Sequence, residues 1–180
     1  MYRIAASAVF LAVTIALLAL AVARGQSVDD PVLRGQLKRV FPAAASFSAK
    51  TGNPPVFRAY AEAPSGQEPE LLGFAFWTTE IEPLERGYDG PIKMLVGMDM
   101  QGILTGIIVT EDREPYGDFS VETPEFAGQF SGKDIRDRFR VGQDVDAVTR
   151  ATISVTSASR AIRNSARKIA RAYLVPPEQQ

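Results

Sequence analysis

The chain starts with an uncharged apolar run, which sets this segment apart from the remaining sequence that can fold in water. The run is IAASAVFLAVTIALLALAVA, residues 4–23, and it lies between Arg3 and Arg24. A helix of about 20 such residues is long enough to span a bilayer. The run also ends in Ala21-Val22-Ala23, a pattern of the kind that signal peptidase cuts. Residues 1–26 are therefore predicted to be a signal anchor or a signal peptide, and both predict export of the remaining chain.

This export predicts one of two locations. A retained leader makes a single-pass anchor in the cytoplasmic membrane with the domain on the periplasmic side, and a cleaved leader makes a periplasmic protein. The remaining chain has enough length for one compact domain with a single core.

Composition excludes several classes of chemistry. The sequence has no His and no Cys, so it lacks the ligands of c-type haem, iron–sulfur clusters and zinc sites, and it cannot form a His-dependent triad. No metal site and no catalytic residue is predicted. Lys and Arg number 20 against 21 Asp and Glu, with a net charge of −1, so no global field attracts nucleic acid.

The first part of the domain is predicted to be a short helix followed by a loop-rich edge. Asp29 offers an N-cap, Pro31 suits a first helical turn, and Pro42 ends the helix, which spans residues 30–40. Residues 51–69 are rich in Pro, Gly, Ser and Ala around a possible strand at 56–60. Residues 27–70 are therefore interpreted as the lead-in of the same domain.

The second part, residues 71–175, is predicted to be the core. Segments 71–79, 92–98 and 103–110 have the length and the β-branched or aromatic content of strands, and Gly102 suits a hairpin turn between the last two. A helical segment near 124–130 follows. Residues 153–173 carry apolar side chains at helical spacing before Pro176 and Pro177. The fold class is α+β, an antiparallel sheet flanked by helices, with an N-terminal transmembrane or signal helix.

A motif precedes the last helix. The stretch Asp146-Ala147-Val148-Thr149-Arg150-Ala151-Thr152-Ile153-Ser154 resembles D-x-x-[ST]-G-A-T, the signature of the FMN-binding domain family. That family occurs in the Rnf and sodium-pumping NADH:quinone reductase complexes (RnfG and NqrC types) and in NosR-type membrane regulators. Three upstream segments resemble the family in the same order: Gly87-Tyr88-Asp89-Gly90-Pro91-Ile92, the ribbon LVGMDMQGILTGIIV, and Glu111 with Glu114-Pro115. The resemblance covers roughly residues 71–173.

The resemblance implies FMN as the cofactor, joined by a phosphoester to Thr152. It implies a flavin transferase for maturation, and the flavin ring is expected over the loop 87–92. The cofactor-binding residues carried over are Thr152, Thr149, Ala151, Arg150, Asp146, Ser154, Gly87, Tyr88, Gly90, Pro91, Ile92, Glu114 and Pro115. A phosphate at the first turn of a helix would meet free backbone N–H groups and the positive end of the helix dipole.

Two points leave alternatives open at this site. Thr149 and Thr152 could instead be N-caps of the last helix. Arg150 stands where the signature has glycine, so it is strained if the position needs a positive φ, and covalent attachment is then in doubt. Its guanidinium could bind a phosphate or face solvent.

Three functions remain. The first is an extracytoplasmic electron-transfer relay between a membrane-bound donor and an extracytoplasmic acceptor, with a membrane redox complex or an electron-transfer protein as partner. It is a redox carrier rather than a self-contained enzyme, and the absence of G-x-G-x-x-G argues against direct hydride uptake from NADH. The second is a structural or regulatory subunit without redox turnover, and the third is a small reductase. A basic stripe of Arg160, Arg163, Arg167, Lys168 and Arg171 could dock an acidic partner or complement the helix dipole. The acidic run Glu80, Glu82 and Glu85 is expected to be a solvated loop.

Overall fold

The computed structural model describes residues 28–175, and the predicted leader at residues 1–26 lies outside them. Five strands form one antiparallel sheet in sequential order, β1-β2-β3-β4-β5. Their bounds are β1 Ser46–Phe47, β2 Phe57–Tyr60, β3 Leu71–Trp77, β4 Lys93–Asp99 and β5 Leu104–Glu111. Within residues 28–175 no helix is long and apolar enough to cross a membrane.

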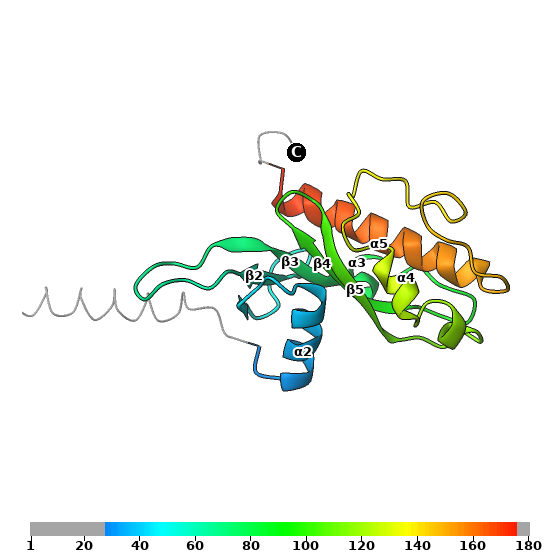
Figure 1. The fold of residues 1–180 in the computed structure, drawn as a ribbon, viewed down its shortest axis with the longest axis horizontal. Coiled ribbons are helices and arrows are strands. Elements are labelled where there is room, and N and C mark those ends of the chain that lie inside the picture. The colour runs from blue at the N-terminus through cyan, green and yellow to red at the C-terminus, as the bar shows by residue number, and fades with distance from the viewer. Residues whose placement is uncertain (1–27, 176–180) are drawn as a thin grey trace, which may run out of the picture.

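Helices cover both faces of this sheet (Figure 1). The helix α2, Pro31–Val40, packs on one face and the long helix α5, Thr152–Tyr173, on the other. Three shorter helices, α3 Thr78–Ile81, η1 Gly117–Phe119 and α4 Pro124–Gly128, lie in the connections. The predicted α+β class with an antiparallel sheet is confirmed.

Two cores form because side chains alternate along each strand. Phe74 and Phe76 of β3 are buried in the core under α5, whereas Ala75 and Trp77 are buried under α2. The helix α5 contributes Val155, Ala158, Ile162, Ala166 and Ile169, all fully buried and spaced three or four residues apart. That spacing gives α5 a continuous apolar face and holds it firmly on the sheet.

The ribbon glycines serve the packing of α2. Gly97 of β4 and Gly106 of β5 are cross-strand partners, and a Cβ at Gly97 would overlap the Val40 carbonyl oxygen at the end of α2. Thr105 donates a hydrogen bond from its hydroxyl to the same oxygen at 2.5 Å. The absence of Cβ atoms therefore lets the helix end approach the sheet closely.

Most predicted elements are confirmed, with differences at their ends. The predicted strand 71–79 stops at Trp77, because Thr78 begins α3 and its hydroxyl accepts the Met94 N–H at 3.2 Å. The N-cap of α2 is Asp30 rather than Asp29, and its carboxylate accepts the Val32 N–H at 2.8 Å.

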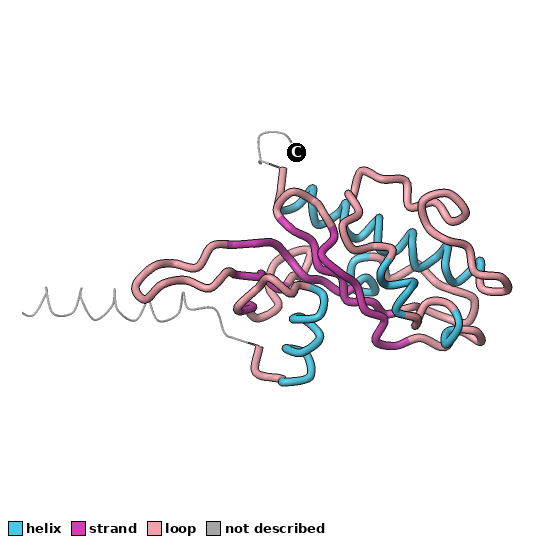
Figure 2. Tube along the Cα trace, viewed as in Figure 1, coloured by secondary structure: helices cyan, strands magenta, loops and turns pink. Residues whose placement is uncertain are grey.

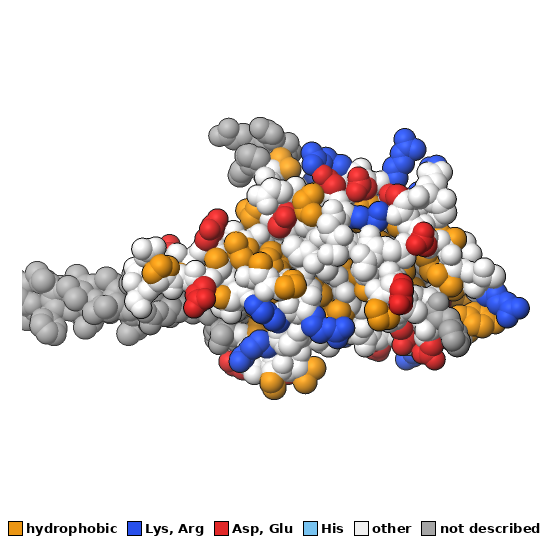
Figure 3. All heavy atoms as spheres, viewed as in Figure 1, with side chains coloured by type: hydrophobic (Ala, Val, Ile, Leu, Met, Phe, Trp, Pro, Cys, Tyr) orange, Lys and Arg blue, Asp and Glu red, His pale blue; other side chains and the backbone are white. Residues whose placement is uncertain are grey.

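The acidic run was predicted to be a solvated loop, and this is correct only in part: Glu80 is exposed but belongs to α3, whereas Glu82 and Glu85 lie in the following loop and are half-buried. Each of the three carboxylates also pairs with a base from a distant part of the chain. Glu80 pairs with Lys50 at 2.5 Å, Glu82 with Lys168 at 2.9 Å and Glu85 with Arg160 at 2.6 Å. On the face shown in Figure 3, acidic and basic side chains are interspersed. This face therefore shows no single-sign field of the kind that nucleic-acid binding uses.

Candidate functional site

The site predicted from the motif lies where α5 begins, at the end of the sheet where long loops gather (Figure 2). Thr152 is the first residue of α5 and is exposed. Ala151 is the N-cap residue, without a side-chain cap bond, and its methyl group is buried in the core. Neither Thr149 nor Thr152 caps the helix, so the capping alternative is wrong.

Arg150 has the backbone conformation that the signature glycine predicts. Its φ is 70°, and Phe139, with a φ of 54°, is the only other non-glycine residue with positive φ in the part of the chain that the structure describes. An L-residue there costs about 1–2 kcal/mol, because its Cβ approaches the following carbonyl oxygen. The chain therefore keeps the geometry of the signature, with a strained arginine in place of glycine.

A buried carboxylate, that of Glu114, joins the loop 87–92 to the first turn of α5. Its oxygens accept backbone N–H groups from Tyr88 at 2.9 Å and Asp89 at 3.1 Å. The Ser154 hydroxyl, also buried, donates to Glu114 Oε2. Three hydrogen bonds from two distant segments therefore converge on one side chain and fix the loop beside the helix start.

Gly87 and Gly90 make the turn that this contact requires. The Gly87 N–H donates to the Gly90 carbonyl at 2.7 Å, and Gly90 has a φ of 152°. A Cβ at Gly87 would overlap the Glu114 carboxylate. Glycine at position 87 is thus needed for the close approach of the loop to Glu114.

Glu85 makes a second connection, which the sequence did not predict. Its carboxylate accepts hydrogen bonds from the Ser157 hydroxyl at 3.0 Å and from Arg160 Nε and Nη2 at 2.9 and 2.6 Å. The same contact raises the pKa of the Arg160 guanidinium above its ordinary value. The segment before Gly87 is therefore attached to α5 one turn beyond Ser154.

The remaining predicted residues contribute in different ways. Ser154 is bound to Glu114, and the Ile92 side chain lies in the core and is not available to a ligand. Asp146 is exposed, and its backbone N–H donates to Gln129 Oε1 at 2.6 Å. Three further residues are exposed, namely Thr149, Pro91 and Pro115. Their cofactor contacts stay predictions.

Exposed apolar side chains lie next to this framework. Tyr88 is 67% exposed and Ile153 is 59% exposed. The Tyr88 backbone is bound to Glu114, and Ile153 directly follows Thr152 in the chain. These two side chains therefore provide apolar surface on the loop and on the first turn of α5.

Comparison with known proteins supports the resemblance seen in the sequence. Residues 87–167 match the model of the FMN-binding domain. This part of the chain is similar to FMN-binding domains. The match begins at Gly87 and includes Glu114 and the first turns of α5, so it spans the site described above. The resemblance seen in the sequence is confirmed, and FMN is the cofactor that the domain indicates.

A relative supports the same assignment. The chain is 27% identical over 145 residues to the protein named "Regulatory protein NosR" from Stutzerimonas stutzeri. The similarity covers 75% of this chain and 19% of that protein. The chain therefore corresponds to about a fifth of the length of this relative.

The residues present fit FMN. The first three N–H groups of a helix have no intrahelical partner. In α5 these groups lie at the end where the exposed Thr152 is the first residue. The described residues contain no group of three or more potential metal-ligating side chains. The arrangement offers a hydroxyl, free backbone donors and apolar surface, the three features that a flavin phosphate and ring require.

Proposed function

We propose that the chain carries FMN in phosphoester linkage to Thr152 and serves as an extracytoplasmic electron-transfer relay of a membrane redox system. The observation that carries this proposal is that Thr152 is exposed at the first position of α5, on the helix whose first turn Glu114 connects to the loop 87–92. When bound, FMN supplies one- and two-electron redox chemistry. The chain's own residues position it.

Attachment at Thr152 is chemically favourable. A phosphate on this hydroxyl lies at the positive end of a helix of 22 residues, where backbone N–H groups lack intrahelical partners. A flavin transferase would supply a flavin dinucleotide as the donor. The bond from Thr152 Oγ to the phosphorus on the flavin side would form as the phosphoanhydride bond breaks, and the departing nucleoside monophosphate would take up the hydroxyl proton. Thr152 is exposed, so a transferase can reach it.

The framework around Thr152 provides a fixed support. Glu114 accepts two loop N–H groups and the Ser154 hydroxyl, and Glu85 connects the same segment to Ser157 and Arg160. A relay works best when its cofactor does not move between electron arrival and departure, because reorganisation slows transfer. These contacts therefore support a carrier role, and the exposed Tyr88 and Ile153 provide the surface that a ring would cover.

Expression in a host with a periplasmic flavin transferase tests the attachment. The wild-type protein, denatured with acid, should retain flavin absorbance in the washed pellet, and Thr152→Val should lose it. Thr156→Val is the matched control, since this threonine is exposed, lies one turn further along α5 and is not among the predicted cofactor-binding residues. A colourless wild-type pellet, or colour retained by Thr152→Val, contradicts the proposed attachment.

Membrane location is proposed from the apolar residues 4–23. A retained anchor predicts that the full chain stays in the membrane fraction after high-salt and carbonate washing. Release into the periplasmic fraction with a shortened N-terminus instead indicates a cleaved leader. Either result keeps the domain outside the cytoplasm, whereas protection of the folded domain from protease in intact spheroplasts contradicts the proposed export.

A regulatory or structural subunit without redox turnover is the second candidate. Arg150 favours it, because a strained arginine replaces the signature glycine directly before the attachment sequence. The name of the relative, a regulatory protein, agrees with it. This candidate predicts native protein without flavin absorbance that still copurifies with a membrane complex. Flavin absorbance that responds to reduction by a membrane donor favours the relay.

A further inference from the structure

A second site lies along α5, beyond the attachment threonine. A cavity of about 440 Å³ opens between α5 and the segment 138–141. Five of its eight lining residues are arginines: Arg138, Arg140, Arg160, Arg163 and Arg167. Thr156 is the lining residue nearest to Thr152 along α5, and Thr152 itself does not line the cavity. The cavity therefore begins about 6 Å along the helix from the attachment position.

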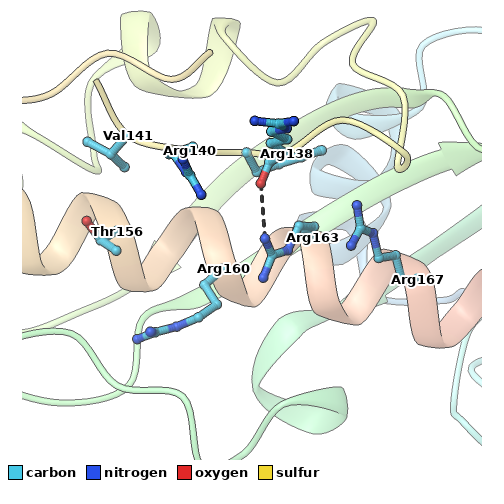
Figure 4. Close-up of a pocket in the computed structure, with 8 residues that line it drawn as sticks. Arg138, Arg140, Val141, Thr156, Arg160, Arg163 and Arg167 are labelled. Atoms are coloured by element: carbon cyan, nitrogen blue, oxygen red, sulfur yellow. Dashed lines mark hydrogen bonds between the residues drawn. The ribbon is translucent and has the colours of Figure 1, made fainter. Parts of the chain in front are cut away.

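Three of these arginines are already held in place. Arg163 donates from Nη1 to the Arg138 carbonyl at 3.0 Å, and Arg167 donates to the carbonyls of Ile135, Arg136 and Asp137. Arg160 is fixed by Glu85. Figure 4 shows Arg140 and Arg163 extending from opposite walls of the cavity. Held side chains lose little further entropy when they bind a ligand.

Each held arginine keeps hydrogen-bonding capacity. Among the described residues, no partner is present for Nη1 of Arg160, Nη2 of Arg163 or Nη1 of Arg167. The Arg140 guanidinium has no partner there either, and no acidic side chain lines the cavity. Arg160 is paired with Glu85, whereas no acidic side chain among the lining residues offsets the positive charge of the other four arginines. An anion in the cavity would offset this charge and satisfy the free donors.

We propose that this cavity is a binding site for a small anion that carries phosphate groups, separate from the FMN attachment at Thr152. Guanidinium forks bind phosphate oxygens in pairs, and the cavity volume is in the range of small-molecule sites. Strongly charged walls disfavour an apolar ligand. The inference rests on the five arginines and not on the proposed relay function.

Calorimetric titration of the purified, flavinylated full chain with pyrophosphate tests the proposal, with sodium chloride added to equal ionic strength in every sample. Arg140→Gln removes a guanidinium that makes no hydrogen bond or ion pair in the described structure, so folding should not change. It should weaken pyrophosphate binding at least about 10-fold, as expected for one lost charge-assisted contact. Arg171→Gln, exposed on the same helix and outside the cavity, should stay within about twofold of wild type.

Three results overturn the proposal. The first is equal binding by wild type, Arg140→Gln and Arg171→Gln. The second is binding by Thr152→Val but not by the flavinylated protein, which assigns the arginines to the phosphate of FMN itself. The third is binding of polyglutamate without binding of pyrophosphate, which assigns the cavity to an acidic protein partner.

Discussion

Replacing Glu114 with alanine should detach the loop 87–92 from α5. The buried carboxylate accepts the N–H groups of Tyr88 and Asp89 and the Ser154 hydroxyl, and the alanine variant loses all three bonds. Ser154 is buried, and in the alanine variant its hydroxyl loses the carboxylate oxygen that accepts its hydrogen bond. Tyr88 and Asp89 are exposed, so water can replace part of what their backbone groups lose.

The expected loss of stability follows from these contacts. Each hydrogen bond to a charged group contributes about 1.5–3 kcal/mol, and a buried unsatisfied hydroxyl costs about 1–3 kcal/mol. Partial replacement by water at the two exposed residues lowers the sum, and we expect about 2–4 kcal/mol. For a domain of this size that corresponds to a decrease in Tm of about 5–15 °C.

Thermal unfolding followed by circular dichroism measures this change. Glu111→Ala is the matched control, because Glu111 is exposed and its only ion pair in the described structure, with Lys93, is 3.7 Å long. Its Tm should stay within about 2 °C of wild type, since exposed pairs contribute little. Ser154→Ala should fall between the two. A Glu114→Ala protein as stable as Glu111→Ala refutes the role assigned to this carboxylate.

Three further predictions address single positions. Arg150→Gly should raise stability by about 1 kcal/mol, because glycine takes a φ of 70° without strain; urea unfolding that shows a loss contradicts this. Gly87→Ala should lower Tm, since the added methyl overlaps the Glu114 carboxylate. The Arg136 hydrogen bond lowers the pKa of Asp134 from 3.8 to about 2. Its contribution to stability is therefore present above about pH 4 and lost as the pH falls through about 2, and Asp134→Asn should abolish this pH dependence in pH-dependent thermal unfolding.

The sequence predicts the elements whose signals are local. The helix α5 and the ribbon of β4 and β5 follow from apolar spacing and from the turn glycine, and both lie within one or two residues of their predicted ends. The strand before them was predicted two residues too long, because Thr78 and Thr79 have β-branched side chains but begin α3. A hydrogen bond between Thr78 and Met94 decides that boundary, and no local pattern contains it.

The candidate site was predicted only in part, because contacts between residues that are distant in the sequence leave no local pattern. The family motifs marked Gly87, Glu114 and Thr152, but their spacing does not show that Glu114 connects the other two segments. The partner of Glu85 is 75 residues away, so the sequence alone suggested a solvated acid. Arg138 and Arg140 were likewise missed, because they face α5 only after the chain has folded. The positive φ at Arg150 was predictable from the glycine of the signature.

Peptide mapping of the flavinylated protein tests the central proposal most directly. Trypsin cuts after Arg150 and Arg160, so Thr152 falls in the peptide 151–160 and Thr149 in the preceding one. We predict that the mass of FMN less one water is found on peptide 151–160 and that fragmentation places it on Thr152. An unmodified peptide from protein matured with the transferase, or a flavin located on any other residue, contradicts the account.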